Sequence, residues 1–128
     1  MNKRILIIDD EEDIRETTQI CLEIANEWQV VTAGSGKEGL LKAACEHPDV
    51  ILLDVMMPDM DGLTTLENLQ ANPQTQNIPV ILLTAKAQAA EQRHFTQLKV
   101  AAVITKPYDP FTLSEQVAQA LIVNSYRE

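Results

Sequence analysis

The sequence predicts an α/β fold in which five parallel strands form one sheet with helices on both faces. Short apolar runs rich in Val, Ile and Leu recur along the chain, and most are continuous rather than alternating, which is typical of strands buried on both faces. Segments with the apolar spacing of amphipathic helices follow them. Strand and helix therefore alternate five times, which implies right-handed crossovers and a parallel sheet. The five runs are residues 5–8, 30–31, 50–53, 80–83 and 101–104.

The first two helices are predicted from apolar stripes and from a cap. The stripe of the first helix comprises Ile14, Thr17, Cys21, Ile24 and Ala25. The second helix opens with a capping box, in which Ser35 is followed three residues later by Glu38. Its predicted inner stripe comprises Leu41, Ala44 and Cys45. Because neither cysteine has a second cysteine or histidine at ligand spacing, we expect buried free thiols, as in a reducing compartment, and no zinc site.

The other three helices differ in how firmly their pattern anchors them. The third follows Asp61-Gly62 and has the stripe Leu63, Leu66 and Leu69. The fourth, at about residues 88–98, is Ala-rich and only weakly amphipathic, so we expect it to be the least anchored element. The fifth begins with Asp109 as N-cap and Pro110 in its first turn. Its predicted inward-facing residues are Leu113, Val117, Ala120 and Leu121.

Length and charge narrow the classes of function. A chain of 128 residues fits one domain, so we expect residues 1–128 to form a single domain with no second domain after it. It has 10 Lys and Arg against 19 Asp and Glu, a net charge of −9. This balance argues against direct binding of nucleic acid or of a membrane surface, since clustered basic residues hold those partners. No segment resembles a signal peptide or a membrane span, so we expect a cytoplasmic protein.

Polar residues follow four of the five predicted strands. In a sheet of strand order 2-1-3-4-5, the flavodoxin-like arrangement, ligands bind at the carboxyl ends of strands one and three. The strand-end residues are Asp9, Asp10, Asp54, Thr84 and Lys106. Three carboxylates in one crevice would repel each other and favour shared protons or a bound cation. Oxygen ligands at a water-accessible edge suit Mg²⁺.

Each of these residues taken alone has an ordinary structural explanation. The acidic run 9–13 precedes a helix, where N-capping and the helix dipole favour Asp and Glu. Lys106 alone could be an ordinary surface lysine, and Thr84 alone could be an ordinary residue at the end of a strand. Because acids, a hydroxyl and a cation converge on the same edge, we favour a phosphoryl-transfer site. Asp54 is the predicted nucleophile, which forms an acyl phosphate, while the ion, Lys106 and Thr84 stabilise the phosphoryl oxygens.

Four motifs occur in the expected order: Asp9-Asp10, residues 54–62, Thr84-Ala85 and Lys106-Pro107. Over essentially the whole chain they resemble the signature of the response-regulator receiver domain of two-component signalling. The resemblance implies that Asp54 accepts a phosphoryl group from a histidine kinase or a phosphotransfer protein. It implies that Asp10, Asp54 and the backbone carbonyl of Met56 bind Mg²⁺, with Asp9 acting through water. Lys106 would pair with one phosphoryl oxygen, Thr84 would hydrogen-bond another, and Ala85 would leave room for the group. The Lys106–Pro107 bond would be cis.

The resemblance also implies how the signal leaves the domain. A downstream protein would bind the face formed by the fourth helix, the fifth strand and the fifth helix, and the chain would be a monomer or a phosphorylation-dependent dimer. It would be no enzyme beyond its own aspartyl phosphorylation and dephosphorylation. The chain departs from the family at Val103, where receivers often carry Tyr or Phe. We therefore do not expect an aromatic rotamer switch.

Two other classes of function compete with a signalling switch. A magnesium-dependent phosphohydrolase with an aspartyl nucleophile commonly needs a second acid two residues later, where this chain has Met56, and a cap that encloses the substrate. No insertion here is long enough for such a cap. An inert interaction scaffold would have lost phosphorylation, yet the acidic, hydroxyl and cationic positions are all filled. Both alternatives are less favoured than the switch.

Overall fold

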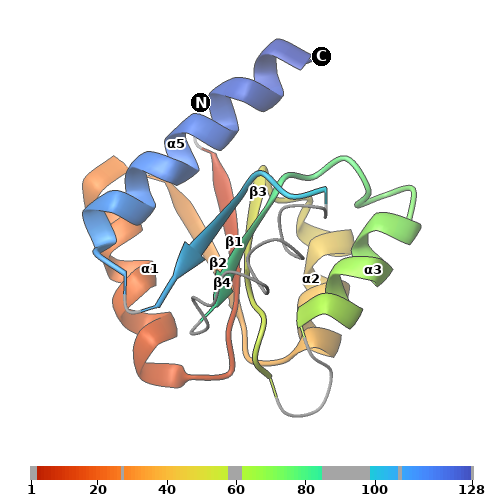
Figure 1. The fold of residues 1–128 in the computed structure, drawn as a ribbon, viewed down its shortest axis with the longest axis horizontal. Coiled ribbons are helices and arrows are strands. Elements are labelled where there is room, and N and C mark those ends of the chain that lie inside the picture. Colours follow the sequence, from red (N-terminus) through yellow and green to blue (C-terminus); the bar gives the residue numbers. More distant parts are fainter. Residues whose placement is uncertain (1–2, 27, 58–61, 85–98, 107, 128) are drawn as a thin grey trace.

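Five parallel strands form one sheet in the order β2-β1-β3-β4-β5, which confirms the predicted α/β fold (Figure 1). The computed structural model describes residues 3–26, 28–57, 62–84, 99–106 and 108–127. The strands are β1 (Arg4–Ile8), β2 (Gln29–Ala33), β3 (Val50–Asp54), β4 (Val80–Thr84) and β5 (Ala102–Thr105). Since β1 and β3 are neighbours, their carboxyl ends lie side by side, with Ile8 paired to Leu53.

Helices cover both faces of the sheet. Figure 1 shows α1 and α5 together on one face and α2 and α3 on the other. Their bounds are α1 (Glu12–Asn26), α2 (Gly36–Glu46), α3 (Gly62–Ala71) and α5 (Pro110–Arg127). The helix predicted at residues 88–98 lies outside the described residues. In the part of the chain that the structure describes, no helix is long and apolar enough to cross a membrane.

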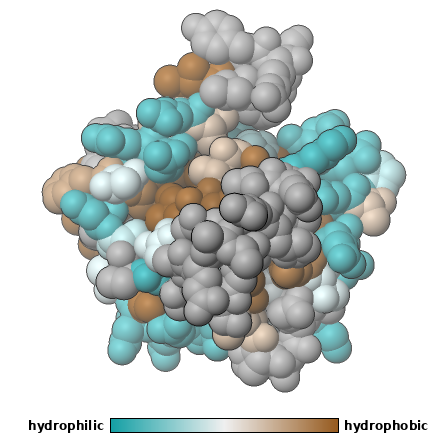
Figure 2. All heavy atoms as spheres, viewed as in Figure 1, coloured by the Kyte–Doolittle hydropathy of each residue, from teal (hydrophilic) through white to brown (hydrophobic). Residues whose placement is uncertain are grey.

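The core consists of two apolar clusters, one on each face of the sheet. Alternate residues of β1 point to opposite faces, so Leu6 and Ile8 join one cluster while Ile5 and Ile7 join the other. Strands β3 and β4 are buried along their whole length, as their continuous apolar runs predict. On the face drawn in Figure 2, hydrophilic residues cover most of the rim, and apolar residues form patches nearer the middle. The strand ends that carry the polar residues are therefore held by a packed interior.

The structure confirms the predicted stripes of α3 and α5 and the predicted N-caps of α2 and α5, but not the reciprocal bond of the capping box in α2. Leu66 and Leu69 of α3 are buried, and so are the inner residues of α5, which are Leu113, Val117 and Ala120. Ser35 accepts a hydrogen bond from the Glu38 amide at 3.2 Å. The Glu38 carboxylate accepts from the Gly34 amide, one residue earlier than a standard capping box has it. The Asp109 carboxylate accepts from the Phe111 amide at 2.9 Å and so caps α5.

The predicted stripe of α1 is wrong by about one position. Ile24 is 78% exposed and Thr17 is exposed, whereas Thr18 and Leu22 are buried. Thr18 and Leu22 are four residues apart, so they share one helix face. Apolar residues at neighbouring positions left the pattern ambiguous, and packing against α5 and the sheet selects the face of Leu22. Cys21 is only partly buried as a consequence.

The predicted inner stripe of α2 is also wrong. Leu41 is 70% exposed and Cys45 is exposed, so the expectation of a buried thiol fails there. The buried residues of α2 are Gly36, Gly39 and Ala43. The cause is a close approach of α2 to β1: a Cβ at Gly39 would lie 2.4 Å from the Ile8 side chain. Small residues form the inner face because larger ones would not fit.

Candidate functional site

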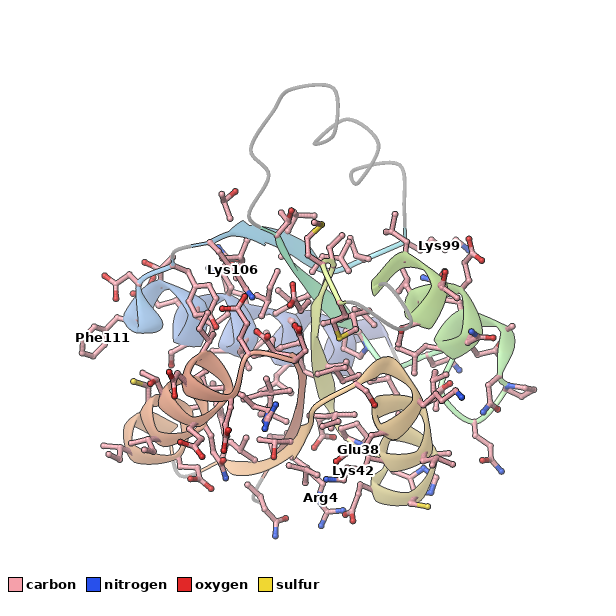
Figure 3. The ribbon with its side chains drawn as sticks, turned by 90° about the horizontal axis from the view of Figure 1, so that it is seen from below. Arg4, Glu38, Lys42, Lys99, Lys106 and Phe111 are labelled. Atoms are coloured by element: carbon pink, nitrogen blue, oxygen red, sulfur yellow. The ribbon has the colours of Figure 1, made fainter. Side chains whose placement is uncertain are left out.

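The carboxyl ends of the strands bring the predicted polar residues to one edge of the sheet. Asp9 follows β1, Asp54 ends β3 and Thr84 ends β4, and all three are buried. Lys106 follows β5, the last strand of the sheet. Its side chain extends from that edge back toward the ends of β1 and β3 (Figure 3). Residues almost a hundred positions apart thus share one site, as the strand order predicts.

The Lys106 ammonium lies among three carboxylates. Nζ donates a hydrogen bond to Oδ2 of Asp9 at 3.0 Å. The same nitrogen is 3.5 Å from Oδ2 of Asp54 and 3.6 Å from Oε1 of Glu11. The Lys106 side chain is only 10% exposed and that of Asp9 is fully buried. Because water screens such a cluster poorly, these charges interact more strongly than a surface ion pair.

The two oxygens of Asp54 have different environments. Oδ1 accepts a hydrogen bond from the Met56 amide at 3.1 Å. Oδ2 is buried and has no hydrogen-bond partner among the described residues, and the Lys106 ammonium lies 3.5 Å from it. A buried oxygen without a partner costs free energy, so an unsatisfied one points to a functional role. Oδ2 is the oxygen available to a cation or to a new covalent bond.

The same surroundings shift the pKa values of both groups. Burial, and then the negative charge of Asp9, raises the pKa of Asp54 to about 7, against the opposing effects of the Met56 amide and Lys106. Burial disfavours the charged form of Lys106, but the hydrogen bond to Asp9 and the surrounding carboxylates outweigh it and raise the pKa of the ammonium. The site therefore has a permanent cation beside a carboxyl group that titrates near neutral pH.

A divalent cation fits the acidic group. Asp9, Glu11 and Asp54 each offer one carboxylate oxygen, and these oxygens lie within 4.8 Å of one another. Hard oxygen ligands of this kind suit Mg²⁺, and the unpartnered oxygen of Asp54 is one of those available. Asp10 is exposed and does not belong to this group. The roles of Asp10 and of the Met56 carbonyl as ligands stay predictions.

Glu11 and Arg15 belong to the site, although the sequence analysis did not single them out. The Glu11 amide donates to Oδ1 of Asp9 at 2.9 Å, which turns the chain and brings the Glu11 carboxylate toward Lys106. Arg15 donates from Nη1 to the backbone carbonyl of Asp9 at 2.7 Å. The acidic run 9–13 was a signal for Glu11. Arg15 of α1 contacts the Asp9 carbonyl, and no spacing in the sequence predicts this contact.

The remaining predicted site residues lie around this centre. Thr84 is fully buried, and its backbone carbonyl accepts from the Lys106 amide at 2.6 Å. Val103 of β5 packs against the core cluster between the sheet and α2 and α3. Ala85 and the predicted cis bond to Pro107 fall outside the described residues.

Gly62 lets the start of α3 approach the end of β3 closely. Its amide donates to the Val55 carbonyl at 2.9 Å. A Cβ at this position would lie 2.3 Å from the Asp54 carbonyl oxygen and 2.5 Å from the Val55 Cα. These are backbone atoms next to the predicted nucleophile, so a larger residue would displace Asp54 itself.

We expect Gly62→Ala to lower the free energy of unfolding by about 3 kcal/mol, because backbone must move to admit the methyl group. Gly34→Ala is the control, since a Cβ there would meet only the end of the flexible Arg15 side chain at 3.2 Å. Urea titrations of both variants check the difference. Equal stability of the two variants would contradict the close approach at Gly62.

The chain is similar to proteins of known family. Residues 5–118 match the family described as Response regulator receiver domain. The chain is 38% identical over 121 residues to the alkaline phosphatase synthesis transcriptional regulatory protein PhoP of Bacillus subtilis, covering 94% of this chain and 49% of that protein. It is 38% identical over 117 residues to the response regulator PleD of Caulobacter vibrioides, covering 91% of this chain and 26% of that protein. The chain thus spans about half, or less, of the length of these curated relatives.

Solved structures agree with these matches. A CheY-like response regulator receiver domain protein from Methanospirillum hungatei superposes with a TM-score of 0.90 at 29% identity, covering 100% of both chains. The chemotaxis protein CheY4 of Vibrio cholerae superposes with a TM-score of 0.86 at 28% identity, covering 94% of this chain and 99% of that one.

Proposed function

The chain belongs to the response regulator receiver domain family, and from this membership we propose that it is a phosphorylatable switch whose Asp54 accepts a phosphoryl group in a Mg²⁺-dependent reaction. The family implies a switch of two-component signalling. One observation supports Asp54 as the acceptor in this chain: its buried Oδ2 has no hydrogen-bond partner in the part of the chain that the structure describes, and it lies 3.5 Å from the Lys106 ammonium.

The carboxylates of Asp54 and of its acidic neighbours would hold Mg²⁺. Asp9 and Asp54 lie within reach of one ion together with Glu11, and the family resemblance adds Asp10 and the Met56 carbonyl. Bound there, the ion would neutralise the carboxylates and polarise the oxygens of an incoming phosphoryl group. Among the described residues one ammonium, that of Lys106, lies beside three carboxylates, two of them buried, and this imbalance supports a requirement for a second cation.

The donor in the proposed reaction is a phosphohistidine on a histidine kinase or a phosphotransfer protein. Oδ2 of Asp54 attacks phosphorus, so an O–P bond forms while the N–P bond of the donor breaks and its electron pair returns to the imidazole. Lys106 would pair with one phosphoryl oxygen, and the Thr84 hydroxyl would donate to another. Asp54 must be deprotonated to attack, and the Lys106 charge favours that state.

The new dianion at Asp54 is the switching signal. It would attract the Thr84 hydroxyl and shift the segment after β4, which alters the face formed by the predicted fourth helix, β5 and α5. Reversing a 1:99 population takes about 5.5 kcal/mol of differential affinity. We expect a downstream protein to bind this face, and the chain to be a cytoplasmic monomer or a phosphorylation-dependent dimer.

Direct binding of nucleic acid is not expected of residues 1–128. Their net charge of −9 is unfavourable for a polyanion. One relative is nevertheless named as DNA-binding, the DNA-binding dual master transcriptional regulator RpaA of Synechocystis. The chain is 38% identical to it over 106 residues and covers 44% of its length. For residues 1–128 we propose no reaction beyond their own phosphorylation and dephosphorylation.

Incubation with acetyl phosphate and Mg²⁺, followed by intact-mass measurement, tests the proposal. We expect wild type to gain one phosphoryl group, and both the Asp54→Asn variant and wild type in EDTA to gain none. Steady hydrolysis of many phosphate esters would indicate a phosphohydrolase instead. No mass gain with acetyl phosphate or with a phosphorylated histidine kinase would indicate an inert scaffold.

A further inference from the structure

The segment that carries Lys106 lies at the edge of the sheet. Among the described residues β5 pairs with β4 alone, so one side of the strand has no neighbouring strand there. From that edge the flexible Lys106 side chain must reach Asp9 at the end of β1, two strands beyond β4. Its backbone amide is fixed by the Thr84 carbonyl. The position of the ammonium then depends on what holds the chain after Lys106.

Tyr108 connects that segment to α1. Its side chain packs against the core cluster on the α1 and α5 face, and its hydroxyl is 2.7 Å from Oγ1 of Thr18, with which it shares a hydrogen bond. Thr18 is 3% exposed, so this bond is largely shielded from water. The two residues are 90 positions apart. A phenyl ring would fill the same space, so packing alone does not explain the hydroxyl.

Helix α1 therefore contacts one partner of the central ion pair, Asp9, and the segment that follows the other partner, Lys106. Through Arg15 it holds the backbone carbonyl of Asp9 at 2.7 Å. Through Thr18 it holds Tyr108, two residues after Lys106. The ion pair itself joins Asp9 to Lys106 at 3.0 Å. One helix thus contacts both the residue that carries the carboxylate and the segment that carries the ammonium.

We propose that Tyr108 is a positioning residue for phosphoryl transfer, because its hydrogen bond to Thr18 fixes Lys106 at its working distance from Asp54. The inference rests on the proposed function. Tyr108 does not touch the reacting atoms and acts through Lys106. A shift of the ammonium by a fraction of an ångström is enough to slow a reaction that depends on charge placed in advance.

A double-mutant cycle distinguishes a role of the Tyr108–Thr18 hydrogen bond in positioning Lys106 from a role in the stability of the fold alone. We expect Tyr108→Phe and Thr18→Val each to slow phosphoryl uptake from acetyl phosphate about tenfold at saturating Mg²⁺. The double variant replaces both hydroxyls with apolar groups of similar shape, which leaves no buried partner unsatisfied. It should regain the melting temperature of wild type and remain slow. A double variant that regains both stability and rate would overturn the inference, since the bond would then be merely structural.

A second cycle tests whether Tyr108 acts through Lys106. In the Lys106→Met background, Tyr108→Phe should cause no further loss of rate, whereas an unchanged tenfold loss would overturn the inference. Wild-type rates in both single variants would overturn it as well, and the proposed function would stand. A wild-type chain that takes up no phosphoryl group would overturn the proposed function and this inference with it.

Discussion

The Lys106→Met variant is expected to take up phosphoryl groups from acetyl phosphate about 100-fold more slowly than wild type, because one preorganised positive group is lost where charge develops. Methionine keeps much of the length and apolar stem of lysine and removes only the ammonium. That ammonium donates to Asp9 at 3.0 Å and lies 3.5 Å from Asp54. The time course of intact mass at saturating Mg²⁺ measures the rate.

Lys99→Met is the matched control for this prediction. Lys99 is exposed, and its backbone carbonyl, which the substitution keeps, accepts from Gln70. Its variant should phosphorylate at the wild-type rate. A Lys106→Met protein that reacts as fast as the Lys99→Met protein would show that the ammonium has no part in the transfer.

The Asp54→Asn variant is expected to be more stable than wild type in EDTA, by about 2 kcal/mol at about pH 8. Burial and the charge of Asp9 raise the pKa of Asp54 from 3.8 to about 7. The folded protein therefore keeps this proton up to about pH 7, while the unfolded chain loses it near 3.8. The contribution of Asp54 to the free energy of unfolding accordingly falls as the pH rises between these values, and an amide has no such dependence.

Urea titrations of wild type and variant between about pH 4 and 8 check this difference. It should be small at the acid end and largest at the alkaline end. Mg²⁺ should reduce it by stabilising wild type, as expected for an ion that binds the folded state. Glu67→Gln, at an exposed position of α3, serves as the control and should show no such gain. A difference that is constant with pH would contradict the raised pKa of Asp54.

The strand ends could be predicted from the sequence because their signal is local. Runs such as 50–53 and 80–83 are apolar throughout, and each is followed by a residue with a polar side chain, Asp54 or Thr84. Alternation with helices makes the sheet parallel, which places those ends at one edge whatever the details of packing. For the same reason Lys106 could be predicted to lie at the same edge as Asp9, although the ion pair between the two residues could not.

The contacts that could not be predicted depend on tertiary packing. The faces of α1 and α2 were misassigned because apolar residues such as Ile24 and Leu41 lie beside the positions that packing selects. In α2 the deciding residue is Gly39, whose lack of a side chain allows the helix to approach Ile8. Contacts such as that between Tyr108 and Thr18 join segments 90 residues apart and leave no periodic trace in the sequence.

The most direct measurement identifies the residue that carries the phosphoryl group. Borohydride reduces an acyl phosphate to an alcohol, so a phosphorylated aspartate becomes homoserine, which peptide mass spectrometry locates. After incubation with acetyl phosphate and Mg²⁺, we expect homoserine at position 54 and at no other position, and none when EDTA replaces Mg²⁺. Homoserine at a different aspartate, or a stable phosphoryl group on a serine, threonine or histidine, would contradict Asp54 as the acceptor.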